Sequence, residues 1–134
     1  MEFPLITALA AAVLILLQIA LMMNTGMARG KAGVGLGDGG NEELLRKIRM
    51  HGNLAENAPI FLITFAFLEV LGTGQITMTA LAGIFILGRF SHAIGLSQTA
   101  GGSPFRAVGA LTTLGSGVAS GGLLLWTLWP QLMA

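Results

Sequence analysis

Three polar residues recur at helical spacing just before an apolar part of the chain: Arg49, Asn53 and Glu56. At about 100° per residue, their side chains fall within one arc of a helix and spread over roughly 10 Å along its axis. An ionisable group beside hydrocarbon is costly unless it faces a protein interior or a wet cavity, so this face predicts a binding site. The simpler interpretation is a juxtamembrane helix whose charges lie among lipid headgroups.

A second pair of polar residues, Arg89 and His92, lies inside a later apolar segment and one helical turn apart. We expect Arg89 to lie roughly 10 Å inside the end of its helix, at a depth similar to that of Glu56. A buried guanidinium is best accommodated by a carboxylate. The pattern therefore predicts an ion pair between Arg89 and Glu56 that holds two helices together, or a ligand site, and the two are compatible. His92 fits either an interhelical hydrogen bond or a place in that site, and its separation from His51 is not a metal-ligand spacing.

The elements that position these residues belong to a membrane protein. Of 134 residues, 54% are hydrophobic and only 10% are charged, whereas soluble domains carry about 25% charged residues. The length suits one domain, residues 1–134. The formal net charge is +1 and no basic stripe carries interleaved aromatic residues, so nucleic acid is not an expected partner. Because there is no cysteine, a thiol that takes part in the chemistry must arrive with a ligand.

Hydropathy predicts an all-α integral membrane protein with four transmembrane helices, at about residues 3–24, 42–71, 76–97 and 104–129. The first apolar run has no Lys or Arg before it and exceeds the usual length of a signal-peptide core, so we expect a retained helix. The segment from Asn24 to Asn41 is rich in glycine and is predicted to be a flexible loop. Asn41 is predicted to be the N-cap of the second helix.

The basic residues predict an orientation in the membrane. Those near the first loop are Arg29, Lys31, Arg46, Lys47 and Arg49. Arg106 borders the third loop, and the second loop has no positive residue. The positive-inside rule then places the first and third loops in the cytoplasm and both termini on the other side.

The predicted cytoplasmic end carries an excess of positive groups. They are Arg29, Arg46, Arg49, Arg89 and Arg106, against Asp38, Glu42, Glu43 and Glu56. A small anionic ligand with a peptide-like body suits such a pocket: arginines would hold its carboxylates, while Glu56 and Asn53 would take an amine and amide groups. Glutathione has these features, and nucleotides or lipid headgroups would also fit.

Two motifs add a family to this interpretation. Arg-x-x-x-Asn-x-x-Glu-Asn-x-Pro-x-Phe, from Arg49 to Phe61, resembles the signature of the MAPEG family, the membrane-associated proteins in eicosanoid and glutathione metabolism. Gly88 to Leu96 resembles the family's Arg-x-x-Tyr/His-x-x-Gly segment on the third helix. The resemblance covers essentially the whole chain. It implies a homotrimer of four-helix bundles that binds glutathione between subunits near the cytoplasmic side.

Matching by residue gives a predicted site. Arg49, Asn53 and Glu56 take glutathione-binding positions, and Arg89 and His92 take positions of the third-helix motif. The predicted glutathione-binding set is Arg29, Arg49, Asn53, Glu56, Asn57, Arg89 and His92.

The chain also departs from the eicosanoid-producing members of the family. Those members have tyrosine where this chain has Asn57 and Leu96, and they place a thiolate-stabilising arginine shortly after the third helix. The nearest candidate here is Arg106, with Ser103 as a possible hydroxyl donor, so these two are the predicted catalytic residues. The pattern is closer to the bacterial branch, similar to microsomal glutathione transferases, which implies a multi-pass protein of a bacterial inner membrane.

The resulting hypothesis is a glutathione transferase or peroxidase that acts on hydrophobic electrophiles by stabilising a thiolate, with glutathione as co-substrate. Its expected partners are copies of itself, the bilayer and a hydrophobic small molecule. An alternative is a non-catalytic binding or scaffold protein on the same fold. A small multidrug-type transporter also has four short helices, but that class places an essential carboxylate in the first helix, and residues 3–23 contain none.

Overall fold

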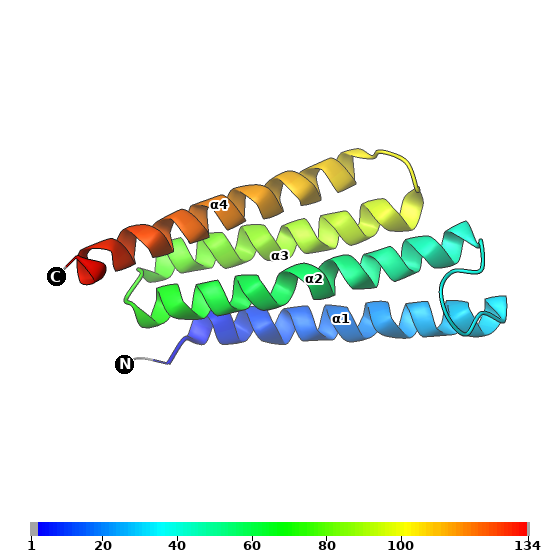
Figure 1. The fold of residues 1–134 in the computed structure, drawn as a ribbon, viewed down its shortest axis with the longest axis horizontal. Coiled ribbons are helices and arrows are strands. Elements are labelled where there is room, and N and C mark those ends of the chain that lie inside the picture. Colours follow the sequence, from blue (N-terminus) through cyan, green and yellow to red (C-terminus); the bar gives the residue numbers. More distant parts are fainter. Residues whose placement is uncertain (1–2, 134) are drawn as a thin grey trace.

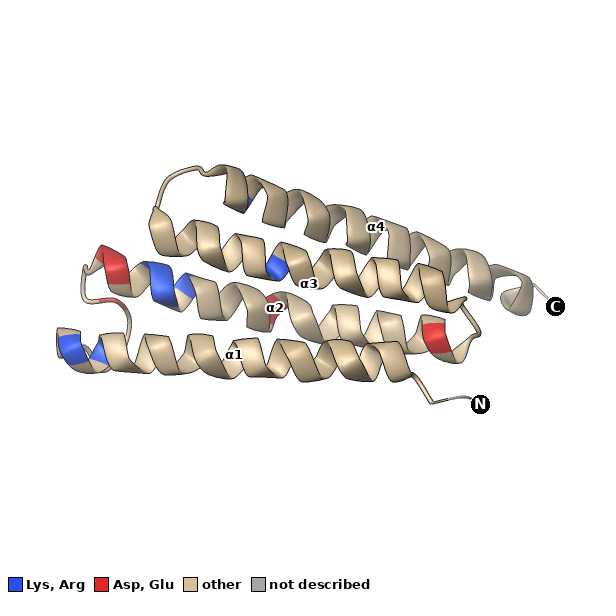
Figure 2. Ribbon diagram, turned by 180° about the vertical axis from the view of Figure 1, so that it is seen from behind, with Lys and Arg blue, Asp and Glu red and all other residues tan. Residues whose placement is uncertain are grey.

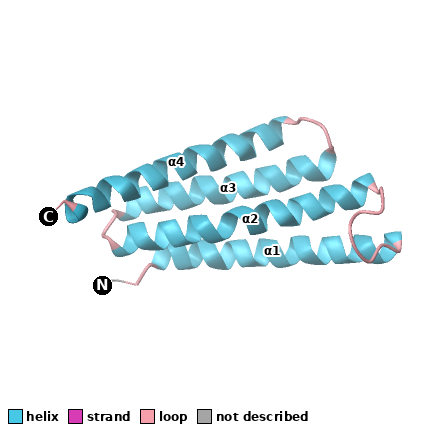
Figure 3. Ribbon diagram, viewed as in Figure 1, coloured by secondary structure: helices cyan, strands magenta, loops and turns pink. Residues whose placement is uncertain are grey.

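The computed structural model describes residues 3–133 and folds them into four helices (Figure 1). These are α1 (Leu5–Ala32), α2 (Glu42–Val70), α3 (Gln75–Gln98) and α4 (Pro104–Leu132). Loops and turns make up the rest of the described chain, which contains no strand (Figure 3). Each helix is long and apolar enough to cross a membrane. The predicted all-α, four-helix membrane architecture is confirmed.

The two ends of the bundle differ in their connections and in their charge. The α1–α2 and α3–α4 loops lie at one end, and both termini lie with the α2–α3 turn at the other (Figure 1). Most charged residues gather toward the end with the two longer loops (Figure 2). This is the same asymmetry on which the predicted orientation depends.

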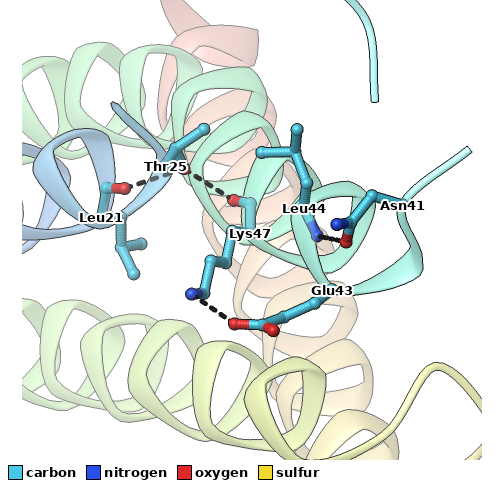
Figure 4. Close-up of polar contacts among 6 residues, drawn as sticks. All are labelled: Leu21, Thr25, Asn41, Glu43, Leu44 and Lys47. Atoms are coloured by element: carbon cyan, nitrogen blue, oxygen red, sulfur yellow. Dashed lines mark hydrogen bonds and ion pairs between the residues drawn. The ribbon is translucent and has the colours of Figure 1, made fainter. Parts of the chain in front are cut away.

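Helix α1 is longer than predicted. We expected it to end near Asn24, but it continues to Ala32 and ends at Gly33, whose φ of 65° is left-handed. The Thr25 hydroxyl lies 2.9 Å from the Leu21 carbonyl oxygen in α1 and 3.0 Å from the Lys47 carbonyl oxygen in α2 (Figure 4). Because hydropathy marks only the part of a helix that crosses lipid, it missed a polar extension that packs on α2.

The start of α2 agrees with its prediction. Asn41 Oδ1 accepts a hydrogen bond of 3.0 Å from the backbone N–H of Leu44, so Asn41 is the N-cap (Figure 4). One turn later Lys47 Nζ lies 2.7 Å from Glu43 Oε1. The helix then continues through Pro59 to Val70.

Helices α3 and α4 approach closely because glycine allows their backbones to touch. A Cβ atom added at Gly109 of α4 would lie 2.6 Å from His92 Cβ and 2.8 Å from the Gly88 carbonyl oxygen, both of α3. Such distances leave no room for a side chain. The contact places the backbone of α4 directly beside Arg89, one residue after Gly88.

An aromatic cluster joins α2 to α3, one helical turn before Arg89 on α3. The rings of Phe61 and Phe85 stack with centroids 4.0 Å apart, and Phe65 meets Phe85 edge to face at 6.0 Å. Phe65 and Phe85 are fully buried. The guanidinium carbon of Arg89 lies 5.5 Å from the Phe85 ring centroid, so the arginine packs over the ring of Phe85.

Candidate functional site

The centre of the site is the buried side chain of Arg89, which is only 4% exposed. Its Nη1 donates to Asn53 Oδ1 of α2 at 2.6 Å. Its Nη2 donates to the Gly109 carbonyl oxygen of α4 at 3.0 Å and to the Thr113 hydroxyl. One guanidinium thus links three helices through neutral acceptors.

The predicted ion pair between Arg89 and Glu56 is wrong. Arg89 bonds to Asn53, while the carboxylate of Glu56 lies 3.4 Å from Arg49 Nη1. The reason is helical rotation: Glu56 lies three positions after Asn53, so their side chains differ by about 60° around α2. Asn53 faces α3, and Glu56 faces outward.

Arg49 and Glu56 form an exposed pair that spans two turns of α2. Their side chains are 53% and 57% exposed in this chain. The pair passes over Gly52, where an added Cβ would lie 3.7 Å from Glu56 Oε1 and 4.0 Å from Arg49 Nη1. An exposed pair of this kind is worth about 0–1 kcal/mol, so a ligand with opposite charges can open it at little cost.

Asn57 and His92 each lie about one helical turn beyond the Arg89–Asn53 contact, Asn57 on α2 and His92 on α3. Asn57 Nδ2 donates to the backbone carbonyl of Asn53 at 2.8 Å. His92 is half-buried and packs against Gly109 of α4. The predicted residues of α2 and α3 therefore meet at Arg89 and Asn53, while His92 packs on α4.

The two predicted catalytic residues lie at the α3–α4 loop, where both have structural contacts. Ser103 is the N-cap of α4, and its hydroxyl oxygen accepts the backbone N–H of Arg106 at 3.2 Å. The Arg106 guanidinium donates to the carbonyl oxygen of Ala100 at 2.7 Å and to that of Gly101. In a single chain, these contacts stabilise the loop and the start of α4.

Arg29 lies apart from the other predicted ligand-binding residues. Its Nη1 donates to the Gly37 carbonyl oxygen at 2.7 Å, which fastens the α1–α2 loop to the end of α1. Together with Ile48 and His51 it lines a small cavity between α1 and α2. Within one chain, Arg29 is therefore on the α1 side of α2, away from Arg89.

Sequence reasoning missed the contribution of α4 to the site. Thr113 donates its hydroxyl proton to the Gly109 carbonyl oxygen at 2.7 Å, which leaves its lone pairs to accept from Arg89. Gly109 and Thr113 stand four residues apart, so they share a helical face. That spacing next to a close-packing glycine was the only signal that could have revealed them.

The arrangement suits recognition of a small molecule that carries both anionic and cationic groups. Arg49 offers a guanidinium, Asn53 an amide and Glu56 a carboxylate on neighbouring turns of one helix. The buried charge of Arg89 lies behind them without a carboxylate partner among residues 3–133. The electrostatic balance of the site therefore favours an anionic ligand.

Comparison with known proteins agrees with the motifs. The family model described as the MAPEG family matches residues 7–129. The inner membrane protein YecN of Escherichia coli strain K12 is 41% identical over 63 residues, which cover 46% of this chain and 47% of that protein. The protein of the same name from E. coli O6:H1 gives the same values. The matched segment spans about half the length of these curated relatives. Because the family model covers residues 7–129 and so includes nearly all of the four helices, the chain belongs to the MAPEG family.

Proposed function

We propose that this protein binds glutathione at the face of α2 that carries Arg49, Asn53 and Glu56. We propose that it uses glutathione as co-substrate in a transferase or peroxidase reaction. The observation that carries the proposal is the exposed Arg49–Glu56 pair beside Asn53, with the uncompensated Arg89 behind it. Glutathione has two carboxylates, one ammonium group and two peptide units. Arg49 would hold a carboxylate, and Glu56 would hold the ammonium group.

The proposed chemistry is stabilisation of a thiolate. A cationic surrounding of low dielectric lowers the pKa of a bound thiol, and the thiolate is the nucleophile. In a transferase reaction, the sulfur forms a bond to an electrophilic carbon, the thiol proton goes to solvent and the leaving group departs. In a peroxidase reaction, two glutathione molecules reduce a hydroperoxide to an alcohol and water and become a disulfide.

Arg106 is the candidate for contact with the sulfur, and its present contacts do not prevent that role. It binds two loop carbonyl oxygens, those of Ala100 and Gly101, through one nitrogen, Nη1. A guanidinium has five N–H groups, so the others stay available for an anion. The Ser103 hydroxyl oxygen caps α4 by accepting the backbone N–H of Arg106, and its hydroxyl hydrogen would be the donor to the ligand.

The assembly that we propose is a homotrimer in a bacterial inner membrane, with glutathione between neighbouring subunits. The support comes from family membership and from the relative named as an inner membrane protein. In addition, many large apolar side chains are exposed on the single chain, which suits contact with lipid and with other copies. Native mass spectrometry in a mild detergent should show three copies, and a spectrum with only monomer or dimer would contradict the trimer.

A specific observation also favours a second candidate, a non-catalytic binding or scaffold protein. Where the eicosanoid-producing members have tyrosines, this chain has Asn57, which bonds to its own helix, and Leu96, which is buried. Ser103 caps α4, and the Arg106 guanidinium binds a carbonyl oxygen of the α3–α4 loop. A protein without thiol activation would keep the binding face and lose the chemistry.

Two measurements test the function in order. Glutathione should raise the melting temperature of the purified protein in detergent, and Arg49→Gln should remove most of that shift. Conjugation of glutathione to an aryl halide, followed by absorbance, then separates the enzyme from the scaffold. A missing thermal shift would contradict glutathione binding, whereas a shift without conjugation or hydroperoxide reduction would favour the scaffold.

A further inference from the structure

We infer that Arg89 is a positioning residue that holds the Asn53 amide in one orientation, so that Asn53 offers N–H donors to the ligand. The ligand group at Asn53 is then a hydrogen-bond acceptor, such as a carboxylate; this assignment rests on the glutathione function proposed above. It differs from the expectation, drawn from the sequence, that Asn53 and Glu56 together receive an amine and amide groups.

The chemistry of the contact determines the orientation of the amide. Arg89 Nη1 lies 2.6 Å from the side chain of Asn53. An arginine has only donors and cannot accept a hydrogen bond, so the atom that faces it must be the amide oxygen. The opposite orientation would bring two sets of N–H hydrogens together and leave a buried guanidinium nitrogen without a partner, at a substantial cost in free energy.

Arg89 itself has little freedom to turn away from Asn53. Its Nη2 is held by the Gly109 carbonyl oxygen at 3.0 Å and by Thr113. Gly109 lies against the backbone of α3, where no extra atom fits. The arginine therefore links α4 to the Asn53 amide on α2 in one fixed geometry.

The amide nitrogen of Asn53 remains for the ligand. It makes no hydrogen bond with residues 3–133, and Asn53 is only half-buried. The backbone carbonyl of the same residue already accepts from Asn57 at 2.8 Å. What Asn53 presents to the surface is thus a pair of N–H donors, one helical turn from the guanidinium of Arg49. A carboxylate can bind both groups, which leaves Glu56 as the acceptor for an ammonium group.

The first experiment changes the donor. Glutathione is titrated by isothermal calorimetry into the wild type, Asn53→Asp and Asn53→Ala. Asp keeps the acceptor for Arg89 and lacks the N–H groups, while Ala lacks both. We expect about tenfold weaker binding or more in both variants. If Asn53 instead accepted from the ligand ammonium, Asn53→Asp would bind as tightly as the wild type or more tightly, and this result would overturn the inference.

The second experiment tests whether Arg89 acts through Asn53. Arg89→Lys keeps a donor and should retain most of the affinity, whereas Arg89→Met should weaken it. In the Asn53→Ala background, Arg89→Met should weaken glutathione binding less than it does in the wild type, because only the charge of Arg89 is then lost. Equal losses in the two backgrounds would mean that Arg89 acts on the ligand independently of Asn53, which contradicts a positioning role.

A spectroscopic signature keeps the test valid if the Arg89 variants do not assemble. The side-chain NH₂ resonance of Asn53 is assigned in the wild type by its absence from Asn53→Asp. It should shift when glutathione binds, because its hydrogens then meet the ligand. If glutathione binds and the Asn53 resonance does not shift, the inference about Asn53 is wrong and the proposed function stands. If the wild type does not bind glutathione, both the proposed function and this inference are wrong.

Discussion

Glu69, near the end of α2, binds the first turn of α1 through Thr7. Its Oε2 accepts the backbone N–H of Thr7 at 2.9 Å and the Thr7 hydroxyl at 2.8 Å, and its Oε1 accepts the backbone N–H of Ile6 at 2.8 Å. The N-cap position of α1 is Pro4, which makes no side-chain cap. A carboxylate from another helix therefore satisfies the free N–H groups and the helix dipole at this end.

Replacing this carboxylate should destabilise the bundle at the end with the termini. We expect Glu69→Ala to lower the free energy of unfolding by about 1.5–3 kcal/mol, because partly buried N–H groups of α1 lose a charged acceptor. Thr7→Val removes only the hydroxyl contact and should cost about 1 kcal/mol. Thermal unfolding of both variants in detergent measures the difference, and a larger loss in Thr7→Val would contradict the capping role.

The contact of Gly109 with α3 predicts a strong effect of one methyl group. Gly109→Ala should cost about 1–3 kcal/mol, because the added carbon overlaps His92 and the Gly88 carbonyl. Gly122→Ala is the matched control on the same helix, since a Cβ there meets nothing within 4 Å. The control should leave the melting temperature of the single chain unchanged or raise it slightly. Equal effects of the two variants would mean that α3 and α4 do not touch at Gly109.

The outward position of Glu56 predicts that its charge matters for binding and little for folding. Glu56→Gln breaks only an exposed pair with Arg49, so the loss of stability should be about 0–1 kcal/mol. Glutathione affinity should fall by about 1.5–3 kcal/mol, the size of a lost charge-assisted hydrogen bond. Glu42→Gln, an exposed change of the same charge at the start of α2, is the control. A Glu56→Gln protein that keeps the full glutathione-induced thermal shift would remove Glu56 from the site.

The orientation in the membrane can be measured with single cysteines, because the chain has none of its own. Leu36 in the α1–α2 loop is 93% exposed, and Gly74 before α3 has open space at its Cβ position, so both accept cysteine. The positive-inside rule predicts that a membrane-impermeant maleimide labels Gly74→Cys in intact cells and labels Leu36→Cys only after lysis. Labelling of Leu36→Cys in intact cells, without labelling of Gly74→Cys, would reverse the orientation.

The sequence alone determined the four helices, the family and the face that carries Arg49, Asn53 and Glu56. These follow from local patterns: apolar runs long enough to cross a membrane, and polar residues whose spacing places them on one side of a helix. Neither kind of pattern depends on how the helices rotate against one another. For the same reason, hydropathy gave the apolar part of α1 correctly and missed its polar extension to Ala32.

Only the tertiary structure decided which groups meet. Charge alone favoured Glu56 as the partner of Arg89, yet a rotation of about 60° around α2 puts Asn53 there instead. Thr113 and Gly109 enter the site because α3 and α4 pack backbone to backbone, and Glu69 meets Thr7 because α2 ends beside the start of α1. Contacts between helices depend on axial rotation and relative shift, and several residues far apart in the chain determine these two quantities together.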